Sequence, residues 1–379
     1  MTTRIVFLVP GFFGFTSIGA LSYFEDVEQT LVRALRRRGV AARVVRCATQ
    51  PTSSIPRRAD SLRRQVIDAD GLRADELHFV GHSTGGLDLR MLLTPAVKIA
   101  SGSSAERIAR LTKTAICVAT PHHGTPLAKH FISVQGQSLL LLLAALATSA
   151  QGRGAVLAAA KAIALVARLD DWMGRKDTPL DRIAEGLLRK IRVNRRDPVW
   201  KYLGEIEKDQ GAVLQLTPEG IALFEASVTD RPEIDYGCVV AGVPTPHETI
   251  RLKELVDPEY IALRVLFRLL HALAAQAHPH YPYPRTSRAT QRQLDRGLGF
   301  KATPAISDGI VPTLSQLHGR VLHVACADHL DVVGHYTLAG GRSGNWLPSG
   351  AGFTRKAFDS LWEAVAAAIS RRAGPRPAQ

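Results

Sequence analysis

Short apolar runs alternate with amphipathic stretches along most of the chain. Six of these runs are bounded by turn residues and predict buried strands: Arg4–Val9, Ala42–Arg46, Leu77–Gly81, Ala115–Ala119, Tyr236–Val243 and Arg320–Ala325. Helical spacing of apolar residues predicts helices at Tyr23–Arg38, which Gly39 ends, and at Thr354–Arg372. Strands that alternate with helices favour an α/β fold with a mostly parallel central sheet flanked by helices.

The chain is long enough for one large core with insertions. Its 379 residues are 46% hydrophobic, which is ample for a sizeable core. We predict a core formed by residues 1–120 and 236–379, and a helical cap or lid formed by residues 121–235, which exceed what a crossover helix needs. Within the core, residues 244–305 form a second insertion.

Both insertions carry features that the sequence leaves open. Residues 139–147 and 155–169 are apolar helical patterns too short to span a membrane. They fit either a lid over an acyl-chain site, able to contact a lipid surface transiently, or helices buried against the core. In the second insertion we predict a helix at Pro258–Ala277 and an irregular loop at His278–Arg296, with histidines that face solvent.

A glycine-rich motif directly after the third apolar run points to a nucleophile. Residues Gly81–Gly86 read G-H-S-T-G-G, and Ser83 therefore lies on a tight turn between a strand and a helix that ends before Thr94-Pro95. Glycines two residues either side of the serine let strand and helix approach closely.

If Ser83 attacks an acyl carbonyl, the oxyanion that forms needs two preorganised N–H donors. The loop Pro10–Gly14 follows the first predicted strand and its glycines free the backbone amides. We therefore predict an oxyanion hole formed by the amides of Phe12 and Thr84. The alternative is that Pro10-Gly11 only turns the chain.

A serine nucleophile needs a histidine base and an acid that orients it. His329 follows the last predicted strand and opens a loop close to the last helix, where strand-end residues carry the chemistry of such folds. Asp308 lies between Ser83 and His329 within Ser307–Pro312. We predict the catalytic residues Ser83, Asp308 and His329, in that chain order.

These segments resemble the α/β-hydrolases, and within them the bacterial triacylglycerol lipases and esterases. The resemblance is carried in patches by Pro10–Phe12, Gly81–Gly86, Thr120–Ala128, Ser307–Gly309 and His329–Asp331. It departs where Pro10 precedes Gly11, since similar lipases often have His-Gly there. The resemblance implies an α/β-hydrolase fold and an enzyme that cleaves carboxylic esters, in particular acylglycerol-type lipid esters.

The expected mechanism is acyl transfer to water through an acyl-enzyme, with a lipid or small ester as substrate. The same triad would serve a lipid acyltransferase or a thioesterase, and a catalytically silent lipid-binding or partner-binding protein of this fold is the non-enzymatic alternative.

No cofactor is expected. Some similar lipases bind calcium near the catalytic histidine, and Asp331 resembles one such ligand; without a partner carboxylate, its alternative role is to cap or anchor the histidine loop. His82 is predicted to point away from the site, either as a packing residue or as one that supports the site from behind. His122 and His123 are predicted to form a structural turn, with contact to the substrate as the alternative. The four cysteines fall in strand-like runs and predict buried thiols, not a disulfide framework or a zinc site.

The chain is basic, with 48 Lys and Arg against 34 Asp and Glu and a formal net charge of +14. Its basic residues alternate with apolar ones and no nucleic-acid-binding motif accompanies them, so specific nucleic-acid binding is not expected. The N-terminus enters the first strand at once, which predicts a cytoplasmic protein, or a secreted one if a leader has been removed. The oligomeric state is open.

Overall fold

The computed structural model describes residues 2–12, 17–18, 21–95, 102–132, 209, 211–245, 258–276, 283–336 and 348–371. Its strands are β1 (Arg4–Val9), β2 (Ser17–Ile18), β3 (Leu21–Ser22), β4 (Arg43–Arg46), β5 (Glu76–His82), β6 (Thr112–Val118), β7 (Asp235–Gly242) and β8 (Arg320–Cys326). Its α-helices are α1 (Val27–Arg37), α2 (Ile55–Asp68), α3 (Thr84–Leu93), α4 (Gly102–Leu111), α5 (Leu127–Ile132), α10 (Gly211–Gln215), α11 (Pro218–Ser227), α12 (Pro258–Ala274), α13 (Arg288–Leu298) and α14 (Arg355–Ser370). The 3₁₀ turns are η1 (Gly71–Arg73), η3 (Thr313–Gln316) and η4 (Asp331–Val333).

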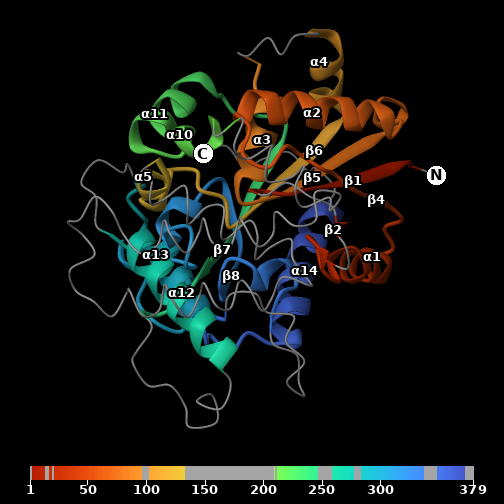
Figure 1. Ribbon diagram of the computed structural model, residues 1–379. Coiled ribbons are helices and arrows are strands. Elements are labelled where there is room, and N and C mark those ends of the chain that lie inside the picture. Colours follow the sequence, from red (N-terminus) through yellow and green to blue (C-terminus); the bar gives the residue numbers. More distant parts are fainter. Residues whose placement is uncertain are drawn as a thin grey trace, which may run out of the picture.

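The central sheet is parallel and has the order β4-β1-β5-β6-β7-β8 (Figure 1). All six strands predicted from the apolar runs are present, with ends that differ by three residues at most. β1 and β5 lie next to each other near the middle, and the order of the strands reverses there. The carboxyl ends of these two strands therefore open onto the same crevice, where open α/β sheets bind their ligands.

Helices cover both faces of the sheet, as the alternation in the sequence predicts. Along β1, Ile5, Phe7 and Val9 pack with α2, α3 and α4, whereas Val6 and Leu8 pack with α1 and α14. Figure 1 shows α2 and α3 on one side of the sheet and α1 with α14 on the other. Strands buried on both faces explain the continuous apolar runs.

One element differs from the sequence-based expectation. The stretch His278–Arg296 was expected to be an irregular loop, but Arg288–Leu298 forms the helix α13. Ser287 caps its N-terminus by accepting from Thr290 N, and Gly299 ends it in the left-handed conformation. Only Leu294 and Leu298 of this polar helix are buried, against β7 and β8, so tertiary packing stabilises a segment with little hydrophobic content. The predicted helix at Pro258–Ala277 is confirmed as α12.

Much of the predicted cap lies outside the described residues, including the apolar patterns 139–147 and 155–169. The described parts of residues 121–235 contain α5, α10 and α11. Ile221 and Phe224 of α11 pack in the same cluster as Phe79 of β5 and Leu62 of α2. These parts therefore rest on the core. No helix within the described ranges is long and apolar enough to cross a membrane.

Candidate active site

Ser83 occupies a strained turn between β5 and α3. Its backbone has φ 54° and ψ −133°, a conformation that is costly for a residue other than glycine. The flanking glycines are needed sterically, because a Cβ on Gly81 would lie 2.6 Å from the carbonyl carbon of Gly85, and one on Gly85 would lie 2.5 Å from the Val9 oxygen. The turn thus places the serine at the carboxyl edge of the sheet, at the start of a helix.

The loop after β1 comes into direct contact with this turn. A Cβ on Gly11 would lie 2.4 Å from Cβ of Ser83, so only glycine permits this approach. Phe12 follows directly. Thr84 is the first residue of α3, and its N–H has no acceptor within the helix. Of the two residues predicted to form the oxyanion hole, Phe12 therefore follows a residue in close contact with Ser83, and Thr84 follows Ser83 itself.

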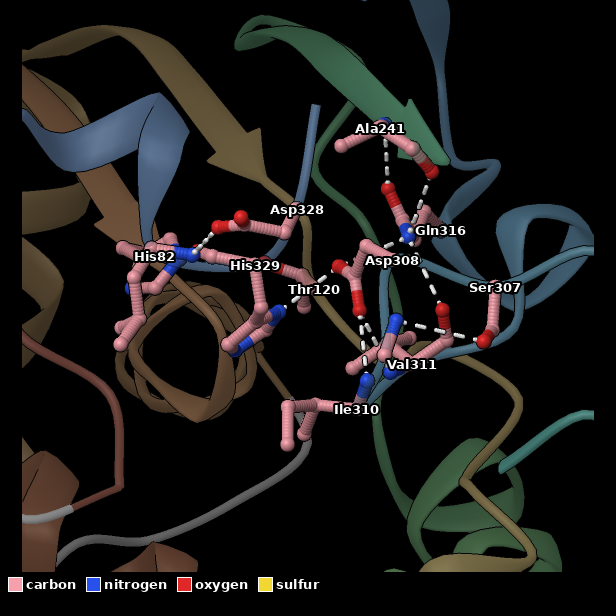
Figure 2. Close-up of polar contacts among 12 residues, drawn as sticks. His82, Thr120, Ala241, Ser307, Asp308, Ile310, Val311, Gln316, Asp328 and His329 are labelled. Atoms are coloured by element: carbon pink, nitrogen blue, oxygen red, sulfur yellow. Dashed lines mark hydrogen bonds and ion pairs between the residues drawn. The ribbon is translucent and has the colours of Figure 1, made fainter. Parts of the chain in front are cut away.

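Asp308 is buried and lies among hydrogen-bond donors. Its Oδ1 accepts from the backbone N–H groups of Ile310 and Val311 at 2.9 and 2.7 Å, and its Oδ2 accepts from Gln316 Nε2 at 3.1 Å (Figure 2). Gln316 is itself held in orientation by Ala241, whose N–H donates to Oε1 at 2.7 Å and whose carbonyl accepts from Nε2 at 3.1 Å. Three donors therefore hold the Asp308 carboxylate in place as an acceptor.

The fourth partner of this carboxylate is His329. Its Nδ1 lies 2.7 Å from Oδ2 of Asp308, and its backbone N–H donates to the Asp308 carbonyl at 2.9 Å. Because Asp308 acts as an acceptor, Nδ1 carries the proton, and Nε2 is the basic nitrogen. The pair that was predicted from separate loops is thus brought together by the structure.

His82 connects this pair with the serine turn. Its Nε2 lies 2.9 Å from the carbonyl oxygen of His329, and the centroids of the two rings are 4.7 Å apart. His82 immediately precedes Ser83, so His329 lies directly beside the turn. The structure therefore brings Ser83, Asp308 and His329 to one place at the carboxyl ends of β5, β7 and β8.

Solved structures of bacterial lipases and esterases share this arrangement of elements. The chain aligns with lipase 1 from Pelosinus fermentans over 98% of its own length and 100% of that chain, at 16% identity and a TM-score of 0.51. With EstA from Clostridium botulinum the shares are 98% and 87%, at 14% identity and a TM-score of 0.52. The chain has the α/β-hydrolase fold. No family model and no curated protein matches it.

Within this fold a buried ion pair supports the loop after β1. Arg58 of α2 and Asp88 of α3 are both fully buried, and Nη2 of Arg58 lies 2.8 Å from the Asp88 carboxylate. The same nitrogen donates to the carbonyl oxygens of Pro10 and Gly11, each at 3.0 Å. Burial raises the pKa of Asp88 to about 6, against the opposing effect of Arg58. The guanidinium thus joins the loop to the helix that follows Ser83.

Asp331 anchors the histidine loop, one of the two roles that the sequence left open. Its Oδ2 accepts from the Asp328 N–H at 3.0 Å, and Asp328 Oδ1 accepts from the N–H groups of Leu330 and Asp331. Burial and the neighbouring Asp328 raise the pKa of Asp331 well above its ordinary value. Among the described residues, no group of three or more His, Cys, Asp or Glu side chains could hold a metal ion.

The sequence also made predictions for His122, His123 and the four cysteines. His122 is buried, and its ring stacks on His318 with centroids 4.4 Å apart. The His123 N–H donates to Ser315 Oγ at 3.1 Å, which ties the turn to η3. All four cysteines are free, and three of them are buried.

Several residues around the site were not found from the sequence, namely Tyr23, Arg58, Asp88, Gln316 and Asp328. Two of them left a local signal: a charged residue inside an apolar stripe is unusual without a buried partner. Arg58 lies in α2 among the buried residues Ile55, Ala59 and Leu62, and Asp88 lies between two buried leucines. Tyr23 and Gln316 have no such signal.

Proposed function

We propose that the protein is a serine hydrolase that cleaves carboxylic esters. His329 Nε2 removes the Ser83 proton, Ser83 Oγ attacks the ester carbonyl, and the amides of Phe12 and Thr84 stabilise the oxyanion. The imidazolium then protonates the leaving alcohol. A water that His329 deprotonates attacks the acyl-enzyme and releases the acid. Asp308 holds His329 in the tautomer that this sequence of steps needs.

The observation that carries the proposal is the Asp308–His329 hydrogen bond of 2.7 Å next to a serine with φ 54°. The hydrogen bond to Asp308 leaves Nε2 of His329 as the basic nitrogen. His329 contacts His82, which directly precedes Ser83 in the sequence. Lipid esters are the proposed substrate class because the segments that resemble bacterial lipases are accompanied by apolar sequence patterns at residues 139–147 and 155–169.

Hydrolysis of p-nitrophenyl esters from acetyl to palmitoyl tests the proposal, with Ser83→Ala as the matched blank. We expect Ser83-dependent turnover that increases with acyl length, and labelling of wild-type protein but not of Ser83→Ala by a fluorophosphonate. A preference for short chains would contradict the lipid substrate alone. Absence of both turnover and labelling at every chain length would refute the serine hydrolase.

A lid over the acyl site predicts a second kinetic feature. Turnover of a long-chain ester should rise when its concentration passes the solubility limit, because an aggregated substrate offers an apolar surface that keeps a lid open. A profile that saturates smoothly through this limit would contradict the lid and leave the esterase intact.

A further inference from the structure

A chain of three hydrogen bonds crosses the site behind Ser83. The Gly11 N–H donates to the Tyr23 hydroxyl at 2.9 Å, that hydroxyl lies 2.7 Å from His82 Nδ1, and His82 Nε2 lies 2.9 Å from the carbonyl oxygen of His329. Tyr23 and His82 are 6% and 1% exposed. Water therefore has little access to replace any of the three bonds.

The protons of this chain can be assigned from its two ends. A carbonyl oxygen only accepts, so His82 Nε2 carries a proton and donates to His329. Neutral His82 then has a lone pair on Nδ1, which accepts the Tyr23 O–H, and the Tyr23 oxygen accepts the Gly11 N–H. Burial and the proximity of His329 lower the pKa of His82 well below its ordinary value, which agrees with a neutral ring. Every donor in the chain has an acceptor.

The three bonds join three segments that are distant in the sequence. They connect the loop after β1, which precedes Phe12, with the end of β5, which precedes Ser83, and with the loop after β8, which carries His329. Any shift of one segment would lengthen a buried bond. We propose that Tyr23 and His82 are positioning residues that hold the oxyanion loop and the histidine loop in register across Ser83. This inference rests on the proposed ester hydrolysis.

Neutrality of His82 is part of the role. Its ring centroid is 4.7 Å from that of His329, which becomes an imidazolium when Ser83 attacks. A charge on His82 would repel that cation. Among the described residues, the titratable groups around His82 and the Tyr23 hydroxyl are His329, His335 and the Arg58–Asp88 pair. Nε2 of His335 donates to the Tyr23 carbonyl oxygen at 3.1 Å.

Three substitutions separate the links. Tyr23→Phe keeps the ring and removes both bonds of the hydroxyl. His82→Asn retains an acceptor near the Nδ1 position for Tyr23 but cannot reach His329, whereas His82→Gln retains a donor toward His329 but no acceptor for Tyr23. Tyr336→Phe is the matched control, because it removes another buried tyrosine hydroxyl, from a ring that packs on Phe353 and Phe358.

Steady-state kinetics on a p-nitrophenyl ester test the role, with thermal unfolding to verify folding. We expect Tyr23→Phe to lower kcat about tenfold to hundredfold with little change in KM, the range for leaving buried hydrogen-bonding groups unpaired. Tyr336→Phe should leave kcat within about twofold. Equal kcat values for the two tyrosine variants would overturn the proposal.

The double variants give a pattern that a purely structural role does not. On a His82→Gln background Tyr23→Phe should cost little further kcat, because the link between the two residues is already broken. On a His82→Asn background it should cost nearly as much as in the wild type. If Tyr23→Phe lowered kcat by the same factor on both backgrounds, the proposal would be overturned.

One measurement is independent of activity. Nitrogen-15 NMR of the histidine rings at neutral pH should report His82 as neutral and protonated on Nε2 in the wild type, with an altered Nδ1 resonance in Tyr23→Phe. A charged or Nδ1-protonated His82 would overturn the inference even in an active enzyme. If Ser83-dependent turnover and labelling were both absent, the proposed function would fail and a His82 with the expected tautomer would still establish the hydrogen-bond chain.

Discussion

Asp308→Asn is expected to disable the catalytic histidine through a single reversed hydrogen bond. The carboxamide has one oxygen, and the two backbone donors of Ile310 and Val311, at 2.9 and 2.7 Å, cannot become acceptors. The oxygen therefore stays in the Oδ1 position. The amide group then takes the position of Oδ2, where it faces His329 Nδ1 at 2.7 Å.

The side chain of Gln316 cannot turn to accommodate the new amide group. Its Nε2 donates to Oδ2 of Asp308 at 3.1 Å and would meet that amide group in the variant, but a turn of the Gln316 amide would lose both bonds to Ala241. His329 must therefore accept at Nδ1, which places the proton on Nε2 and removes the base from Ser83. We expect kcat to fall about 10⁴-fold, or about 5 kcal/mol at 1.36 kcal/mol per tenfold.

The assay is kcat for a p-nitrophenyl ester, with denaturant unfolding to confirm that the variant folds. Asp331→Asn is the matched control, since an amide can replace a carboxyl group whose pKa is raised well above its ordinary range, and we expect kcat to fall less than about fivefold. A loss below tenfold for Asp308→Asn, or a larger loss for Asp331→Asn, would show that Asp308 does not orient the base.

Arg58→Met should lower the free energy of unfolding by about 3–5 kcal/mol in denaturant titration, because it leaves the buried Asp88 carboxylate without a cation. Adding Asp88→Leu should restore part of this loss, and an equal loss in the single and the double variant would contradict the reasoning. Asp331 binds its proton more tightly folded than unfolded, so stability should decrease as pH rises above 3.8, and Asp331→Asn should flatten that decrease in pH-dependent unfolding; an unchanged slope would refute it. Gly11→Ala should abolish Ser83 labelling, since its Cβ would lie 2.4 Å from the serine Cβ, and normal labelling would disprove the close approach.

Much of the fold was predictable because its determinants are local. The inner strands β1, β5, β6 and β7 are buried on both faces and are therefore almost continuously apolar in the sequence. The edge strands β4 and β8 are only partly buried, and polar residues interrupt their runs. The serine turn needs small residues at fixed offsets, and Gly81 and Gly85 therefore mark it. Helix α13 was missed although Ser287 and Gly299 are ordinary caps, because its polar face outweighed the two buried leucines Leu294 and Leu298 in the pattern.

The sequence also determined the candidate chemistry: the chain order of Ser83, Asp308 and His329 follows from motifs, and Ser83 and His329 each follow a predicted strand. Only the tertiary structure decided what holds them. Tyr23, Arg58 and Gln316 act across long sequence separations, and a hydroxyl, a guanidinium or an amide carries no trace of its partner in the neighbouring residues. Hydrogen bonds need atoms within about 3 Å in a defined direction. Such distances exist only after the sheet and helices have packed.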